Sequence, residues 1–123
     1  MYRNSTVIDI GAHIGYYSLM AAAMGHSAVA IEPLNTNSDL LQMSAHLNNF
    51  SQDVTLLQNA VYDRRTYATL TSNKDNQGGV WIKSTNSKYT SETSTNYVST
   101  ITIDDVIPYV KQNSVIIKID IGK

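Results

Sequence analysis

The first half of the chain alternates short apolar runs with segments in which apolar residues recur at helical spacing. The apolar runs predict buried strands at residues 7–10, 28–31 and 54–57. A helix is predicted between the first two strands, where the apolar positions that recur at helical spacing are Ile14, Tyr17, Ala21 and Met24.

The two predicted helices have recognisable ends. Gly25 is a natural C-terminal stop for the first helix. The second helix is predicted to begin near Asn37 or Ser38, either of which can cap it, and to run to about Asn48. The resulting β-α-β-α-β series implies parallel strands joined by right-handed crossovers. We therefore expect one α/β domain over residues 1–123.

The middle of the chain is less regular. Short strands are expected at residues 67–71 and 80–82, on either side of a turn-rich segment at residues 73–79. Residues 84–94 are rich in Ser, Thr and Asn and show neither a helical nor a strand period. We interpret this last segment as a loop or an irregular hairpin.

The pattern becomes regular again toward the end of the chain. It predicts a strand at residues 97–103 and a short helix at residues 104–110, with Asp104 as its cap. Residues 115–121 form an apolar strand, which we expect at the centre of a parallel sheet, covered on both faces. Because the chain stops after Gly122 and Lys123, we expect the sheet to be incomplete at the C-terminus. We expect residues to be missing before Met1 as well.

Composition narrows the possible functions. The formal net charge of -1 gives no electrostatic basis for binding nucleic acid or an anionic membrane. The absence of cysteine excludes disulfides, thiolate zinc sites and cysteine nucleophiles, and it fits a reducing compartment. The longest apolar stretch, at residues 20–24, is too short to span a bilayer. We expect a cytoplasmic protein, while the oligomeric state cannot be inferred from the sequence.

Polar residues stand where the predicted strands end. Asp9 and the segment from Gly11 to Gly15, called the glycine loop below, follow the first strand. The corresponding residues on the other strands are Glu32, Asn59 and Asp120. Ligands of open α/β sheets bind outside the carboxyl ends of the strands, so these groups are expected to meet at one crevice.

Each of these groups also has a purely structural interpretation. The glycine loop is compatible with a tight strand-to-helix turn in any α/β protein. Glu32 can be a solvated residue before Pro33, Asn59 can be a turn former, and Asp120 can cap a loop. A ligand site is favoured because groups from four separate strands would point toward one place.

The spacing of these groups indicates a nucleoside. A carboxylate at Glu32 can accept hydrogen bonds from both hydroxyls of a ribose. Asn59 and Ala60 could offer an amide and backbone groups to an adenine edge. His13 occupies the position at which dinucleotide-binding loops have their middle glycine, and Asp9 would repel a diphosphate. An adenosyl ligand with a cationic amino-acid tail fits better, which points to S-adenosylmethionine.

In that interpretation Asp9 favours an ammonium or sulfonium group, and the start of the following helix favours a carboxylate. His13 lies in the glycine loop and can line the site, but the three histidines show no metal-ligand spacing. Lys118 is interpreted as a partner of Asp120. Aromatic residues are not interleaved with basic ones, which argues against a nucleic-acid stacking surface.

The motifs of this chain resemble, in order, those of the FkbM-type methyltransferase family. The resembling segments are residues 7–18, 32–35 (Glu-Pro-Leu-Asn), 59–63 (Asn-Ala-Val-Tyr-Asp), 100–107 and 117–121 (Ile-Lys-Ile-Asp-Ile). The likeness spans nearly the whole chain, although the first motif alone marks only the wider class I methyltransferases. The family continues the last strand with glutamate and glycine, where this chain has Gly122 and Lys123.

The resemblance implies an S-adenosylmethionine-dependent methyltransferase with a Rossmann-like, mostly parallel sheet and flanking helices. It implies methyl transfer to the oxygen of a small-molecule acceptor. The residues implied to surround the methionine part are Asp9, Gly11, Ala12, His13 and Gly15. Glu32, with Pro33 beside it, would hold the ribose, Asn59 and Ala60 the adenine, and Asp120 would face the transferred methyl as a catalytic base.

Two other interpretations remain open at this point. A truncated chain could bind the cofactor, or nothing, without turnover. An NAD-dependent oxidoreductase would share the strand, the loop and the acid on the second strand, but this chain lacks its glycine spacing.

Overall fold

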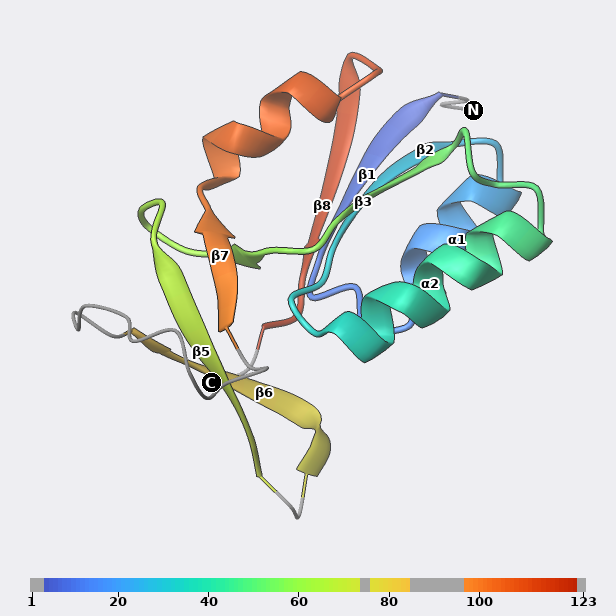
Figure 1. Cartoon of the computed structure of the whole chain (residues 1–123). Coiled ribbons are helices and arrows are strands. Elements are labelled where there is room, and N and C mark those ends of the chain that lie inside the picture. The colour runs from blue at the N-terminus through green and yellow to red at the C-terminus, as the bar shows by residue number, and fades with distance from the viewer. Residues whose placement is uncertain (1–3, 74–75, 85–96, 122–123) are drawn as a thin grey trace.

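A sheet of parallel strands forms the larger half of the protein (Figure 1). The computed structural model describes residues 4–73, 76–84 and 97–121. The strands of this sheet, in spatial order, are β3 (Val54–Leu57), β2 (Ser27–Ile31), β1 (Ser5–Ile10) and β8 (Ser114–Ile119). All neighbouring pairs run parallel, which confirms the predicted α/β class and the four predicted strands.

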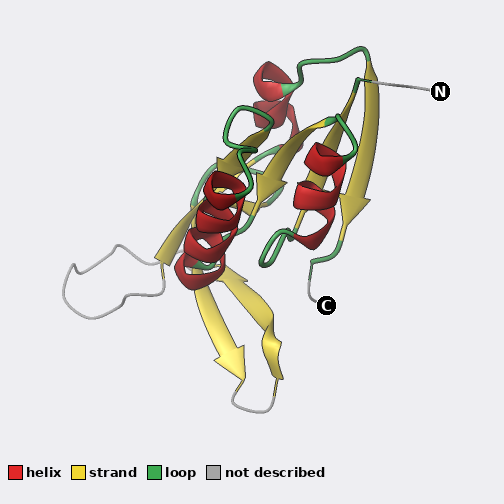
Figure 2. Cartoon of the chain, turned by 90° about the vertical axis from the view of Figure 1, so that its right-hand side faces the viewer, coloured by secondary structure: helices red, strands yellow, loops and turns green. Residues whose placement is uncertain are grey.

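Helices cover both faces of this sheet (Figures 1 and 2). On one face, α1 (Tyr16–Ala23) and α2 (Asn35–Leu47) pack against the alanines of β2. On the other face, Val106 of η1 (Ile103–Tyr109) packs against the larger aliphatic side chains of β1 and β2. Since side chains alternate along a strand, the small and large residues of β2 fall on opposite faces. This layered arrangement is Rossmann-like.

A second four-stranded sheet follows β3 in the chain. Its strands, in spatial order, are β4 (Ala60–Val61), β7 (Tyr97–Ile101), β5 (Tyr67–Asn73) and β6 (Asn76–Ser84). β4 runs parallel to β7, whereas the β5 pairs are antiparallel. The strands predicted in this region are confirmed, and β5 and β6 are longer than predicted. Of the predicted loop at residues 84–94, all but Ser84 lies outside the described residues.

The buried face of α1 shares only Ala21 with the apolar set that indicated the helix. Ser18, Ala21 and Ala22 are buried, whereas Tyr17 and Met24 are exposed. Small residues are favoured here because α1 lies directly against the alanines of β2 and the side chain of Leu41. The helix itself and its end before Gly25, which has a positive φ of 85°, are confirmed.

The predicted caps of the next two helices are wrong. α2 begins at Asn35, and the N–H of the preceding Leu34 donates to Glu32 Oε1 at 3.0 Å, so neither Asn37 nor Ser38 caps it. Asp104 was predicted to cap the short helix near the end of the chain. The start of η1 has instead a capping box formed by Thr102 and Asp105. At α2 no side chain caps the first turn, whereas at η1 the Asp105 carboxylate accepts the N–H of Thr102.

β8 was expected at the centre of the sheet, but it lies at the edge among the described strands (Figure 1). Its aliphatic side chains are exposed on both faces, including Ile116 at 54% and Ile119 at 63%. Gly122 and Lys123 lie outside the described residues. Within the part of the chain that is described, no helix combines the length and apolar character needed to cross a bilayer.

Candidate functional site at the carboxyl ends of the parallel strands

The glycine loop leaves β1 and turns sharply into α1. Gly11, His13 and Gly15 all have positive φ values, of 77°, 54° and 92°. Glycine adopts this conformation freely, whereas His13 is held there at a cost in backbone strain. The N–H groups of Gly11 and Ala12 both donate to the Ile31 carbonyl at the end of β2, at 2.9 and 3.1 Å. The loop is therefore fixed to the neighbouring strand.

Both glycines at the ends of the loop are packed closely by other elements. A Cβ on Gly11 would overlap the backbone oxygen of Asp120, directly after β8. A Cβ on Gly15 would lie 2.6 Å from Cγ of Leu41, a fully buried residue of α2. The loop thus lies in contact with β8 on one side and α2 on the other, which explains why glycine is required at both positions.

Glu32 joins the loop to the end of β2. Its Oε2 accepts the backbone N–H of His13 at 2.8 Å, and its Oε1 accepts the N–H of Leu34. A longer contact of 3.5 Å joins Oε1 to the Asn37 amide. Glu32 is only 5% exposed. The sequence-predicted loop and acid are therefore brought together, with Pro33 directly beside them in the chain.

Asp9 is the most deeply buried member of the predicted set, with no exposed surface. Its Oδ2 accepts the hydroxyl of Ser18 in α1 at 2.8 Å. Its Oδ1 lies 2.9 Å from Nζ of Lys118. The two groups form an ion pair, but the angles of this contact are not those of a hydrogen bond. The prediction that Lys118 pairs with Asp120 is therefore wrong. Because Asp9 and Lys118 are adjacent in the β1–β8 register, the lysine reaches across to β1.

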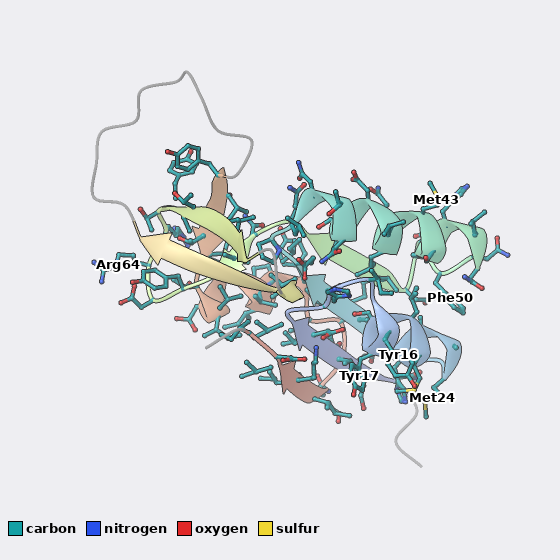
Figure 3. All side chains as sticks on the ribbon, turned by 90° about the horizontal axis from the view of Figure 1, so that it is seen from below. Tyr16, Tyr17, Met24, Met43, Phe50 and Arg64 are labelled. Atoms are coloured by element: carbon teal, nitrogen blue, oxygen red, sulfur yellow. The ribbon has the colours of Figure 1, made fainter. Side chains whose placement is uncertain are left out.

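Lys118 has two further partners at the same place. Its Nζ donates to the carbonyl oxygen of Gly11 at 3.0 Å and lies 5.2 Å from the ring centre of Tyr17. Figure 3 shows Tyr17 beside Tyr16 on α1, and the two rings meet edge to face at 5.1 Å. Sequence reasoning missed Ser18, and it missed the contact of Lys118 with Asp9. The contact of Lys118 depends on the register between β1 and β8, in which Lys118 lies opposite Asp9.

Asn59 and Ala60 lie at the junction between the two sheets. The Asn59 amide donates to the hydroxyl of Ser99 at 2.7 Å and to its carbonyl at 3.2 Å. Ala60 is buried, at 2% exposure. The structure therefore joins Asn59 to β7, and no described contact links it directly to the glycine loop.

Asp120 lies immediately after β8, and its N–H donates to the Ile10 carbonyl at 2.9 Å. Its side chain is exposed. Its backbone touches Gly11, so the strand end that carries Asp120 meets the loop directly. The start of α1 adds backbone donors, since it has no side-chain cap and no acidic residue in its first turn. Among the described residues no cluster of three or more histidines and carboxylates could hold a metal ion.

Comparison with solved structures found several methyltransferases that are similar to part of this chain. An S-adenosylmethionine-dependent methyltransferase from Agrobacterium tumefaciens is 18% identical, with 49% of this chain and 20% of that chain covered and a TM-score of 0.45. One from Geobacter sulfurreducens, in complex with S-adenosyl-L-homocysteine, is 18% identical. The alignment covers 51% of this chain and 27% of that chain, with a TM-score of 0.45. A search of curated proteins found no match.

The aligned part of this chain thus spans about a fifth to a quarter of the length of those two structures. The sequence also matches the family model of the methyltransferase FkbM domain over residues 9–121. That match includes the glycine loop, Glu32, Asn59, Lys118 and Asp120. Because it covers nearly all of the 123 residues, the chain belongs to the methyltransferase FkbM domain family.

Proposed function

We propose that the chain binds S-adenosylmethionine and serves in methyl transfer to the oxygen of a hydroxyl acceptor. The observation that carries this proposal is the 2.8 Å hydrogen bond from the N–H of His13 to Glu32. It brings the glycine loop and the acidic residue of β2 into one place, at the ends of parallel strands where α/β proteins bind nucleosides. Membership of the FkbM family supports the same reaction class.

The residues at this place fit the parts of such a ligand. A carboxylate has about four acceptor positions, so Glu32 can accept ribose hydroxyls in addition to its two backbone donors. The uncapped start of α1 suits the ligand's carboxylate. The loop residues Gly11, Ala12, His13 and Gly15 would lie along the methionine part, and Asn59 and Ala60 along the adenine. A small-molecule acceptor and cytoplasmic location remain predictions.

When bound, S-adenosylmethionine supplies a methyl group already activated by its sulfonium. The protein then has to hold donor and acceptor in line, and orientation of this kind can supply roughly 7–11 kcal/mol in well-aligned cases. We assign to Asp120 the removal of the acceptor's proton, because its exposed carboxylate follows the strand end that touches the loop. The acceptor's proton would be held on Asp120, while the glycine loop and Glu32 would hold the methyl donor.

Calorimetric titration with S-adenosylhomocysteine tests the binding part of the proposal. The chain is expected to bind this ligand, and Glu32→Gln is expected to weaken binding by about tenfold or more, because a charged acceptor of the ribose is lost. Asp39→Asn removes a carboxylate from the exposed side of α2 and is the matched control. Binding of NAD in place of S-adenosylhomocysteine would favour an oxidoreductase instead. Binding of neither ligand would contradict the proposal.

The role of Asp120 is tested in the full-length protein with a defined acceptor. Asp120→Ala is expected to leave the dissociation constant for S-adenosylhomocysteine unchanged and to lower turnover by about 10²–10⁴-fold, the usual contribution of a general base. Loss of binding and turnover in equal measure would place Asp120 in the cofactor site instead.

A further inference from the structure

Lys118 connects three elements beneath the glycine loop. From β8 its ammonium reaches Asp9 on β1, the carbonyl oxygen of Gly11 in the loop, and the ring of Tyr17 on α1. Its side chain is 24% exposed, so most of it is enclosed. The group of Asp9, Ser18, Lys118 and the Gly11 carbonyl is called the Lys118 cluster below.

The peptide unit between Gly11 and Ala12 is held at both of its polar ends. Its oxygen accepts from Lys118 of β8 at 3.0 Å, and its N–H donates to the Ile31 carbonyl of β2 at 3.1 Å. The next N–H along the chain, that of His13, is the one that binds Glu32. Rotation of the Gly11–Ala12 peptide would therefore also move the donor that joins the loop to Glu32. Of the two partners of the Gly11–Ala12 peptide, Lys118 contributes a side chain and Ile31 a backbone carbonyl.

The charge of Asp9 is matched inside the protein. The residue has no exposed surface, and its two oxygens face Ser18 and Lys118 at 2.8 and 2.9 Å. A cation and an anion this close act on a more distant group as a dipole and not as a net charge. A ligand outside the loop therefore does not meet a free carboxylate at Asp9.

We infer that Lys118 is a positioning residue for the glycine loop, and that Asp9 and Lys118 together present no net charge to the ligand. This inference rests on the proposed function, since the ligand that the loop receives is S-adenosylmethionine. It replaces the hypothesis that Asp9 attracts the sulfonium or ammonium of that ligand. In the new assignment Asp9 holds Lys118, and Lys118 holds the Gly11 carbonyl.

The double variant Asp9→Asn/Lys118→Met tests both halves of the inference. It removes both charges at once, so the net charge of the chain is unchanged and no buried charge is left without a partner. Thermal unfolding and titrations with S-adenosylmethionine and S-adenosylhomocysteine are measured on the same samples. The first ligand carries a sulfonium charge and the second does not, so the ratio of their affinities reports any charge that the site directs at the ligand.

We expect the double variant to stay folded and to bind both ligands about 10- to 100-fold more weakly, because the charged donor to the Gly11 carbonyl is lost. The ratio of the two affinities should stay as in the wild type. A fall in that ratio would show that Asp9 acts directly on the sulfonium and would overturn the charge assignment. Unchanged affinity for both ligands would overturn the positioning role.

Lys111→Met is the matched control, because Lys111 also donates to a backbone carbonyl at 2.9 Å, that of Gln52, away from the loop. It should change neither affinity. If the double variant does not fold, Lys118→Arg replaces it, since arginine keeps the charge beside Asp9 but presents a larger, planar group with different donor positions. Weaker binding of both ligands in equal proportion is then expected, and unchanged affinities would overturn the inference.

Hydrogen exchange at the Ala12 amide separates this inference from the proposed function. Faster exchange in the double variant than in the wild type is expected, whether or not a ligand binds. Unchanged exchange would refute the positioning role by itself. Failure of the wild-type chain to bind either ligand would instead refute the proposed function, and the exchange result would still decide the role of Lys118 in the loop.

Discussion

Two acid–base pairs in this protein have the same chemistry and different surroundings. At the glycine loop, Asp9 accepts a hydroxyl from Ser18 and pairs with Lys118. At the start of η1, Asp105 accepts a hydroxyl from Thr102 and pairs with Arg65, with one contact of 3.0 Å. The side chains of Asp9 and Lys118 are 0% and 24% exposed, whereas those of Asp105 and Arg65 are 18% and 77% exposed.

Burial decides what each pair does. The Asp9 pair joins β1, α1 and β8 at the carboxyl ends of the parallel strands, where water cannot replace a lost partner. The Asp105 pair closes the first turn of η1 and ties it to the segment after β4, where water can hydrate either group. An ion pair of an aspartate with a basic residue therefore joins the elements of the candidate site in one region, and in the other region it accompanies the cap of η1.

The largest effect is expected for Gly11→Ala, compared with Gly25→Ala. Both glycines have positive φ, so alanine costs about 1–2 kcal/mol at either position. A Cβ at Gly11 would also overlap the Asp120 backbone oxygen, whereas at Gly25 it meets nothing within 4 Å. Gly11→Ala should therefore lower the free energy of unfolding by more than about 4 kcal/mol, as measured by urea titration. Equal losses for both variants would contradict the close packing of Gly11 against β8.

The next largest effect is expected for Asp9→Ala, compared with Asp105→Ala. Removing Asp9 leaves Lys118 largely enclosed without its anion, and breaking a buried pair costs about 3–5 kcal/mol. Asp105→Ala removes a cap and leaves Arg65, whose side chain is 77% exposed and can be hydrated, so its effect on the unfolding midpoint should be much smaller. Should the two variants unfold at the same denaturant concentration, burial would not distinguish the two pairs.

The smallest effect is a pH dependence at η1. Arg65 and the Thr102 backbone N–H hold the pKa of Asp105 well below its usual value. A carboxyl whose folded pKa is lowered contributes stability above its unfolded pKa of about 3.9, and that stability is lost as the pH falls toward the folded value. The unfolding temperatures of the wild type and Asp105→Asn should therefore differ slightly at neutral pH and draw progressively closer as the pH falls below about 4. A constant difference from pH 2 to pH 7 would contradict this assignment.

The sequence predicted the strands of the parallel sheet well, because each is a short apolar run bounded by turn residues. It also brought Glu32 and the glycine loop together correctly, since both follow neighbouring parallel strands. The partner of Lys118 was missed because it depends on the register between β1 and β8, which are far apart in the chain. Lys118 is two residues from Asp120 in sequence but directly opposite Asp9 in the sheet.

The helix starts were misjudged for a related reason. Asn37 is a good capping residue by type, but α2 begins at Asn35 without a side-chain cap, and the N–H of the preceding Leu34 donates to Glu32. The place of β8 at the edge of the described sheet could not be predicted either. The apolar character of a strand indicates that its faces can be buried, but it does not indicate which strands lie beside it.

The most direct measurement is amide NMR of the isotope-labelled chain during titration with S-adenosylhomocysteine. If the ligand lies across the strand ends, chemical-shift changes should be concentrated at the amides of the glycine loop, at Glu32 and Leu34, and at Asn59 and Ala60. The amides of α2 beyond its first turn should move little. Changes centred elsewhere, or none at saturating ligand, would contradict a nucleoside site formed by the glycine loop and Glu32.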